Sequence, residues 1–174
     1  CLRVVFGAQH KLPAAAVGTG KEQPISPTLI TRHTLAEQSP RPRILVAEDN
    51  VVNQKLAVRM LDRLGYQPDV VSNGQEAVTA FEREVYAAII MDCQMPILDG
   101  IQATKDIRYN EKVLNVYKPV LIIALTANAS VEDKNTCLNA GMNQFLAKPF
   151  SYEQIEKVLQ IVIEQTEKDL ERAA

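Results

Sequence analysis

The sequence predicts a doubly wound three-layer α/β fold built on a five-stranded parallel sheet. Two observations support this prediction. Five short apolar runs alternate along the chain with five segments whose apolar residues recur at helical spacing. The runs are apolar throughout rather than alternating with polar residues, as in strands that are covered on both faces. Right-handed crossovers between successive parallel strands would then place helices on both sides of the sheet.

The five predicted strands are short, and each is followed by polar or charged residues. They cover residues 44–47, 69–71, 87–91, 120–125 and 144–147. The first run ends at the acid pair Glu48-Asp49, and the third ends at Asp92. The run at 120–125 carries the strongest strand pattern, with six consecutive apolar residues.

The five predicted helices follow the strands and are bounded by capping residues and glycines. The first covers residues 52–64, the second begins with a capping box at Ser72, and the third covers residues 100–108. The fourth runs for about ten residues from Ser130 to a stop at Gly141, and the fifth is capped by Ser151 and Gln154. In the first helix we expect four apolar side chains to face the core, namely Leu56, Met60, Leu61 and Leu64.

The domain boundaries follow from composition. Residues 1–40 are interrupted by prolines and glycines and are interpreted as a linker or the remnant of an upstream module. Residues 41–168 form the predicted α/β domain, and residues 169–174 a tail. Because the sequence begins with Cys1 rather than methionine, we expect it to be a fragment of a longer protein. Its three cysteines lack the spacing of a disulfide framework, which favours reduced thiols in a cytosolic protein.

Charge and hydropathy exclude two classes of partner. The 19 basic and 21 acidic residues give a net charge of −2, which offers no general attraction to nucleic acid or to an anionic membrane. Apolar runs stay well short of the roughly 20 residues that span a membrane. We therefore expect no direct nucleic-acid partner.

Charged side chains gather where the predicted strands end. The carboxyl ends of parallel strands meet at one edge of a sheet, so Glu48, Asp49, Asp92, Thr126 and Lys148 should converge there. Three carboxylates this close would oppose one another's ionisation, and Mg²⁺ would relieve that repulsion. The first strand is not followed by a glycine-rich phosphate loop, which argues against a P-loop or a dinucleotide site. Acids at this position also argue against a flavin.

Four motifs in order along the chain resemble the receiver domain of two-component response regulators. They are Glu48-Asp49, the run MDCQMPILDG at 91–100, the run ALTA at 124–127, and Lys148-Pro149. The resemblance covers residues 43–165 and is strongest to the C-terminal receivers of hybrid sensor histidine kinases. It implies a flavodoxin-like fold with strand order 2-1-3-4-5 and five helices.

The resemblance also implies a phosphoryl site. Asp92 would accept the phosphoryl group from a phosphohistidine, Lys148 would hold a phosphoryl oxygen, and Thr126 with the backbone N–H of Ala127 would complete the cradle. Thr126 and Phe145 would form the conformational switch. The bond between Lys148 and Pro149 is expected to be cis.

A metal site and a set of partners follow from the same resemblance. Mg²⁺ would be bound by Asp49, Asp92 and the backbone carbonyl of Gln94, with Glu48 acting through a metal-bound water. The partners would be a histidine kinase domain, in the same protein or a separate one, and a histidine phosphotransfer domain. The receiver would catalyse its own phosphorylation and dephosphorylation, and it would meet a membrane only as the cytoplasmic part of an inner-membrane sensor kinase.

The outer face of the first helix is the predicted docking surface for the phosphotransfer partner. Val51, Gln54 and Val58 share a helix face that differs from the core face, and Phe150 lies near the same rim of the predicted sheet. Two valines exposed among polar neighbours exceed what solubility requires, although a loosely packed helix face is the simpler interpretation.

Two other functions remain open on the sequence alone. One is a scaffold that acts without phosphorylation, which the complete set of acids, threonine and lysine disfavours. The other is an aspartate-nucleophile phosphatase with an Asp-x-Asp signature, which Gln94, two residues after Asp92, disfavours. About ten residues follow the last predicted helix, so we expect a phosphorelay receiver and not a transcription factor with a DNA-binding domain.

Overall fold

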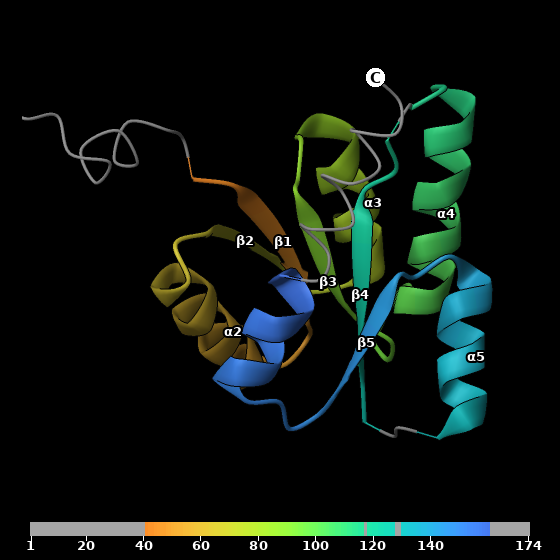
Figure 1. Cartoon of the computed structure of the whole chain (residues 1–174). Coiled ribbons are helices and arrows are strands. Elements are labelled where there is room, and N and C mark those ends of the chain that lie inside the picture. The colour runs from red at the N-terminus through yellow and green to blue at the C-terminus, as the bar shows by residue number, and fades with distance from the viewer. Residues whose placement is uncertain (1–40, 117, 128–129, 161–174) are drawn as a thin grey trace, which may run out of the picture. The chain divides into compact units, whose positions relative to one another are not determined.

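A single parallel sheet forms the centre of the domain, with the strand order β2-β1-β3-β4-β5 (Figure 1). The structure is a computed structural model, and it describes residues 41–116, 118–127 and 130–160. The strands are β1 (Arg43–Ala47), β2 (Gln67–Val71), β3 (Ala88–Asp92), β4 (Leu121–Thr126) and β5 (Gln144–Ala147). This confirms the predicted fold class and strand order. The predicted linker at 1–40 and tail at 169–174 lie outside the described residues.

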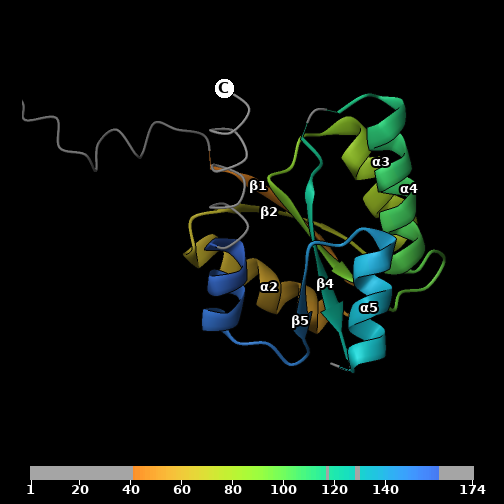
Figure 2. The same ribbon diagram turned by 45° about the vertical axis from the view of Figure 1, so that its right-hand side comes forward.

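Five helices cover the two faces of this sheet in the part of the chain that the structure describes. They are α2 (Val51–Arg63), α3 (Gly74–Arg83), α4 (Gly100–Val113), α5 (Val131–Ala140) and a C-terminal helix described over residues 152–160. Helices α3, α4 and α5 lie on one face, and α2 with the C-terminal helix lies on the other (Figure 2). Among the described helices, none is long and apolar enough to span a membrane.

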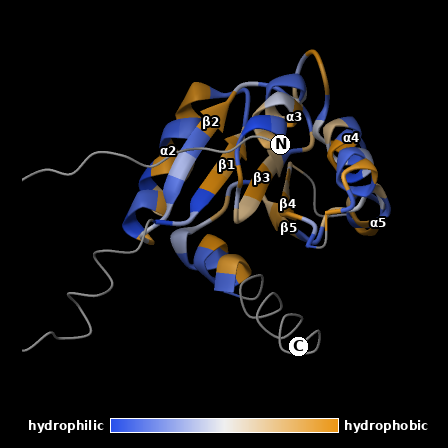
Figure 3. Ribbon diagram, turned by 90° about the horizontal axis from the view of Figure 1, so that it is seen from above, coloured by the Kyte–Doolittle hydropathy of each residue, from blue (hydrophilic) through white to orange (hydrophobic). Residues whose placement is uncertain are grey.

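The hydrophobic core has two halves because side chains alternate between the faces of each strand. In β3, which is buried throughout, Ile89 and Met91 belong to the cluster beneath α3, α4 and α5. Ala88 and Ile90 belong to the cluster beneath α2 and the C-terminal helix. The apolar strands inside a shell of mixed helices are visible from above in Figure 3. This two-sided burial explains why the central strands β1, β3 and β4 are mostly apolar, whereas the edge strand β2 contains Gln67 and Asp69.

Helix α2 lies one residue earlier than the predicted 52–64, and the boundaries of α3 and α4 also differ from the predictions. Helix α3 is capped by Asn73 and not by Ser72: the Asn73 side chain accepts a hydrogen bond from the N–H of Glu76 at 2.9 Å. The Ser72 N–H instead donates to the Glu76 carboxylate at 2.9 Å, so the capping box is shifted by one residue. Helix α4 continues five residues beyond the predicted end at Arg108 because its buried face continues, with Ile107 and Glu111 both enclosed.

The core-facing side of α2 is rotated from the predicted one. Ala57 and Leu61 are buried, whereas Leu56 is 42% exposed, so its predicted place in the core is wrong. Met60 and Leu64 are half-buried against the same cluster, as expected. The buried Ala57 adds a small side chain to a face that the sequence pattern assigned to the larger leucines.

Candidate functional site

Four strands deliver the predicted residues to one edge of the sheet, the lower edge in Figure 1. Glu48 and Asp49 directly follow β1, and Asp92 is the last residue of β3. Thr126 ends β4, and Lys148 directly follows β5. Because β1, β3, β4 and β5 are consecutive in the sheet, these residues form one continuous site, as the sequence predicted.

The three acids form a cluster that fits a hard cation. Each of Glu48, Asp49 and Asp92 offers a carboxylate oxygen, and these oxygens lie within 4.8 Å of one another. Glu48 and Asp92 are only 1% and 5% exposed, whereas Asp49 is open to solvent. Carboxylate oxygens from few protein ligands, with an open side for water, are the donor set that Mg²⁺ prefers.

Lys148 neutralises part of this charge. Its Nζ lies 2.6 Å from Asp92 Oδ2, to which it donates a hydrogen bond, and 2.6 Å from Glu48 Oε2. The other Glu48 oxygen, Oε1, accepts a hydrogen bond from the Asn53 side chain at 2.9 Å. Buried Glu48 Oε2 is therefore held by its ion pair with the Lys148 ammonium.

Burial and neighbouring groups shift the pKa values of Asp92 and Lys148. Burial raises the pKa of Asp92 above its ordinary value, while hydrogen bonds from Lys148 and from the Gln94 N–H act in the opposite direction. For Lys148, burial lowers the pKa, but the carboxylates of Asp92 and Glu48 outweigh burial and leave the pKa raised. The ammonium therefore stays charged at neutral pH, as a group that binds a phosphoryl oxygen must.

A cavity of about 560 Å³ opens beside the acid cluster. Its walls combine the open acid with residues from the ends of β3 and β4 and from α5. They include Asp49, Cys93, Gln94, Thr126, Ala127 and Cys137. Since one water occupies about 30 Å³ in the liquid, the cavity can hold a phosphoryl group together with several waters.

The turn after Asp92 depends on a close backbone approach. A Cβ atom at Gly100 would lie 2.0 Å from the carbonyl oxygen of Asp92. The Gly100 N–H donates to the carbonyl of Cys93 at 3.2 Å, and the Asp99 side chain caps α4 by accepting from the N–H of Gln102 at 2.7 Å. The Asp-Gly pair therefore both begins α4 and packs the helix start against the residue that carries the site.

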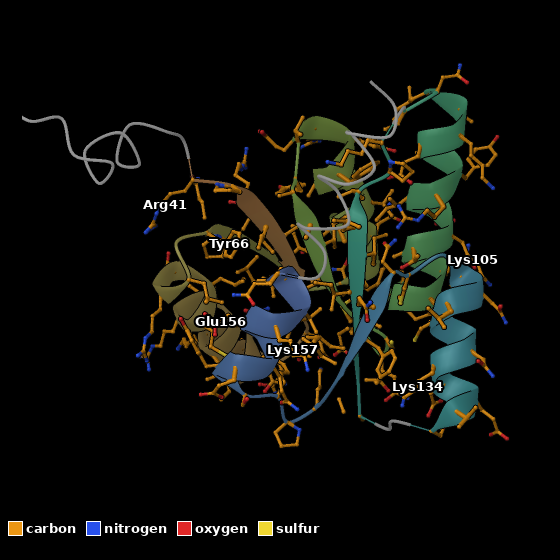
Figure 4. The ribbon with its side chains drawn as sticks, in the orientation of Figure 1. Arg41, Tyr66, Lys105, Lys134, Glu156 and Lys157 are labelled. Carbon is orange, nitrogen blue, oxygen red and sulfur yellow. The ribbon has the colours of Figure 1, made fainter. Side chains whose placement is uncertain are left out.

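The predicted switch residues lie on neighbouring strands. Thr126 is buried and pairs with Ala147 in the β4–β5 register, and Phe145 lies two residues earlier on β5. Phe145 is half-buried against the cluster beneath α3, α4 and α5. Lys134 extends from α5 toward β5, with its Nζ 4.5 Å from the Phe145 ring centroid (Figure 4). The Lys148–Pro149 peptide bond is cis, which confirms that prediction.

The predicted docking residues are not all on the surface. Val51 is 57% exposed, as expected, but Val58 and Gln54 are half-buried, and the Gln54 amide donates to the Glu48 carbonyl at 2.6 Å. Phe150, predicted as an apolar contact for the partner near the same rim, is buried and only 8% exposed, so it offers little surface to a partner. Phe150 precedes the Ser151 cap of the C-terminal helix and shares a core cluster with Ile155, as in a hydrophobic staple.

The exposed apolar side chains of α2 are a different set: Val51, Val52 at 74% and Leu56 at 42%. We call this set the α2 patch. Its residues are spaced as i, i+1 and i+5, on one side of a helix that begins next to the acid cluster. Sequence reasoning missed this side because it assigned Leu56 to the core.

Two further features of the site were not predicted from the sequence. Cys93 and Cys137 are 44 residues apart, yet their sulfur atoms lie 3.5 Å apart beside the cavity. Asn53 and Gln54, on the first turn of α2, both donate to Glu48 and hold it in place. Only the folded arrangement of β1 against α2 shows that these amides serve the site.

Comparisons with known proteins agree with this geometry. The sequence profile of the response regulator receiver domain matches residues 44–160. Hybrid signal transduction histidine kinase K of Dictyostelium discoideum is 40% identical over 131 residues, which are 74% of this chain and 11% of that protein. Histidine protein kinase 1 of Candida albicans is 38% identical over 149 residues, 80% of this chain and 6% of that protein. The chain thus spans a small part of the curated relatives it matches.

Solved structures of receiver domains are also similar to this chain. The receiver domain of sensor histidine kinase PA1611 from Pseudomonas aeruginosa, solved with a magnesium ion coordinated in its active-site cleft, has a TM-score of 0.64 and 46% identity, covering 72% of this chain and 99% of that one. A second match is the complex of the receiver domain of Ssk1 from Saccharomyces cerevisiae with the histidine phosphotransfer protein Ypd1. The matched chain of this complex has a TM-score of 0.64 and 37% identity, covering 68% of this chain and 86% of the matched one.

Proposed function

The chain belongs to the response regulator receiver domain family, and we propose that Asp92 is the residue that accepts the phosphoryl group in its phosphorelay. The observation that carries this proposal is the meeting of Asp92 with two further acids and Lys148 at the carboxyl edge of the sheet. Asp92 is the acid of this cluster that ends the central strand β3.

The proposed reaction moves a phosphoryl group between two nucleophiles. A carboxylate oxygen of Asp92 attacks the phosphorus of a phosphohistidine, the P–N bond breaks, and the histidine nitrogen keeps the electron pair. The product is an acyl phosphate on Asp92, and no general base is needed because the attacking carboxylate is already ionised. Catalysis is then a matter of positioning and charge neutralisation.

The surrounding residues supply that positioning. Asp49, Asp92 and the Gln94 carbonyl would hold Mg²⁺, and Glu48 would act through a metal-bound water. When bound, the ion neutralises charge on the transferred phosphoryl oxygens. Lys148, already 2.6 Å from Asp92, would turn its ammonium to a phosphoryl oxygen as Asp92 loses its charge.

The far side of the phosphoryl group would be held by β4. The Thr126 hydroxyl and the N–H of Ala127 are proposed to cradle it, since both residues line the cavity. Movement of Thr126 toward the phosphoryl group would open space for the Phe145 ring, which is the proposed switch.

Incubation with acetyl phosphate and Mg²⁺ tests the assignment. The wild-type chain should gain one phosphoryl group, and Asp92→Asn should gain none while its circular dichroism spectrum is unchanged. Asp106→Asn is the matched control, because this α4 residue hydrogen-bonds Gln102 away from the acid cluster. A phosphorylated Asp92→Asn variant would overturn the assignment. An unlabelled wild-type chain would instead favour a scaffold, and multiple turnovers a phosphatase.

We propose that a histidine phosphotransfer domain docks on the α2 patch. The patch lies on the helix that begins beside the acids, and a receiver similar to this chain has been crystallised with a histidine phosphotransfer protein. Val52→Glu should slow transfer from the phosphotransfer domain by about tenfold or more, a loss of about 1.4 kcal/mol, and leave labelling by acetyl phosphate unchanged.

Val85→Glu is the control for this docking surface. Val85 is 89% exposed after the end of α3, so it offers the same chemistry away from the α2 patch. Equal slowing of transfer by both variants would contradict docking on α2. Equal slowing of both donors in Val52→Glu would indicate damage to the site itself.

The parent protein is proposed to be a hybrid histidine kinase, with this receiver in its cytoplasmic part. The support is the type of curated relative that matches, and the kinase activity would belong to other domains of that protein. The sequence upstream of residue 1 in the intact gene product tests this, since a kinase core should be encoded there.

A further inference from the structure

Two thiols lie together next to the proposed phosphorylation site. Cys93 Sγ, one residue beyond Asp92, and Cys137 Sγ, on α5, are 3.5 Å apart. Both are free cysteines, and both line the 560 Å³ cavity. Cys93 is half-buried and Cys137 is 3% exposed, so an oxidant that enters the cavity meets Cys93 first.

The backbone of Cys93 is fixed on both sides. Its N–H donates to the Leu125 carbonyl at 3.0 Å, and its carbonyl accepts from the Gly100 N–H at 3.2 Å. A disulfide requires a sulfur–sulfur distance of about 2.05 Å, so the two sulfur atoms must approach by about 1.5 Å. Because Cys93 is bound to its neighbours at both backbone groups, side-chain rotation and movement of α5 must supply this approach.

We propose that Cys93 and Cys137 form a redox modification site, in which a reversible disulfide joins β3 to α5 and slows phosphorylation. Formation of the disulfide follows from the positions of the two thiols and does not depend on the proposed function. Its effect on phosphorylation rests on the proposed function of Asp92.

The chemistry balances with a small-molecule disulfide such as oxidised glutathione. The Cys93 thiolate attacks one glutathione sulfur, the S–S bond breaks, and reduced glutathione leaves. Cys137 then attacks the Cys93 sulfur and releases a second reduced glutathione. The two protein thiols lose two electrons and two protons, and both are recovered in the two glutathione thiols.

Cys137 is 3% exposed and Cys93 is half-buried, so glutathione has restricted access to both thiols and exchange is slow. Oxidation is therefore best followed to equilibrium in a glutathione redox buffer.

The disulfide should slow phosphorylation through two structural connections to the site. Cys93 follows Asp92 directly, so strain on its side chain acts on the reacting carboxylate. On the other side, α5 follows the chain segment that carries Thr126 and Ala127, and its Lys134 packs on the Phe145 ring. A shift of about 1 Å in a reacting group can cost a hundredfold in rate, so a loss of tenfold or more is expected.

The first measurement asks whether the bond forms. The full chain with Cys1→Ser is equilibrated with oxidised and reduced glutathione, digested without reduction and analysed by mass spectrometry. We expect one peptide pair joined through Cys93 and Cys137, two hydrogens lighter than the separate peptides. The added Cys137→Ala variant should give at most a glutathione adduct on Cys93. Absence of the joined pair after full equilibration overturns the proposal.

The second measurement asks what the bond does. Labelling by acetyl phosphate should be at least tenfold slower in the oxidised Cys1→Ser chain than in the reduced one, and dithiothreitol should restore it. Cys137→Ala molecules without a glutathione adduct, identified by mass, should label at the same rate before and after oxidation. Equal rates for the joined and reduced chains overturn the coupling. If neither form is labelled although the bond forms, the proposed function fails and the redox site stands.

Discussion

At the scale of single residues, Asp92 lies where the fold disfavours its charged form. Burial raises its pKa, and a carboxyl group with a raised pKa contributes stability below its ordinary value of 3.8. That contribution is lost as the pH rises through the raised pKa, so at pH 7 the ionised group destabilises the fold.

Asp92→Asn is therefore expected to raise the free energy of unfolding of the metal-free chain at pH 7. Lys148 keeps Glu48 as a partner in this variant. Urea denaturation in the presence of a chelator measures the change. A loss of about 3 kcal/mol or more would show that the ion pair with Lys148 outweighs the cost of burial.

Tyr66 gives a prediction on the alkaline side. Burial raises the pKa of this phenol above 10, and the ring packs against the cluster beneath α2. The associated stability is present below pH 10 and is lost as the pH rises through the raised pKa, because the unfolded chain ionises first. Tyr66→Phe should make the free energy of unfolding fall less steeply above pH 10, as measured by urea titrations at several pH values. An unchanged slope would contradict the raised pKa of this phenol.

At the scale of elements, the start of α4 is locked to the end of β3 through Gly100. Gly100→Ala would place a Cβ 2.0 Å from the Asp92 carbonyl oxygen, so α4 must shift away from the strand. We expect a loss of about 2 kcal/mol or more in thermal or urea unfolding. Labelling by acetyl phosphate should fall with it, because Asp92 moves.

Gly65→Ala is the control for that element. Gly65 has a φ of +88°, but nothing lies within 4 Å of an added Cβ. It should therefore cost only about 1 kcal/mol of backbone strain and leave labelling unchanged. Equal effects of the two variants would show that the contact at Asp92 has no special role.

The sequence allows the strand ends to be predicted, but not which side of α2 faces the sheet. Strand ends were predictable because continuous apolar runs stop abruptly at Glu48 and Asp92. The rotation of α2 was not, because Leu56 and Ala57 are adjacent and both apolar, and only packing on the sheet decides which is buried. The burial of Phe150 was not predictable either, because it depends on packing against Ile155 in the hydrophobic staple and not on the position of Phe150 after Pro149.

At the scale of the whole molecule, the acid cluster should link metal binding to global stability. A cation that binds the folded chain alone stabilises it by about 1.4 kcal/mol at a concentration ten times its Kd. The wild-type Tm should therefore rise with added Mg²⁺, and Asp49→Ala should lose most of this rise. Removal of one of three carboxylates within 4.8 Å should also raise the Tm of the metal-free variant.

A titration with Ca²⁺ and with choline chloride at equal ionic strength separates specific binding from screening. An equal Tm rise with Mg²⁺ in wild type and Asp49→Ala would remove Asp49 from the metal site. The contact between Cys93, after β3, and Cys137, on α5, also belongs to this scale, and sequence reasoning could not find it because 44 residues separate the two positions along the chain.

The edge strand β2 protects the molecule against unwanted self-association. The N–H of Gln67 points inward and donates to the Pro42 carbonyl, so the next residue, Pro68, stands where an N–H would face outward. Proline has no N–H, and the outer edge of the sheet therefore lacks one rung for an incoming strand. A β-strand of another chain therefore cannot pair with β2 in a continuous hydrogen-bond ladder, so Pro68 disfavours aggregation through this edge of the sheet.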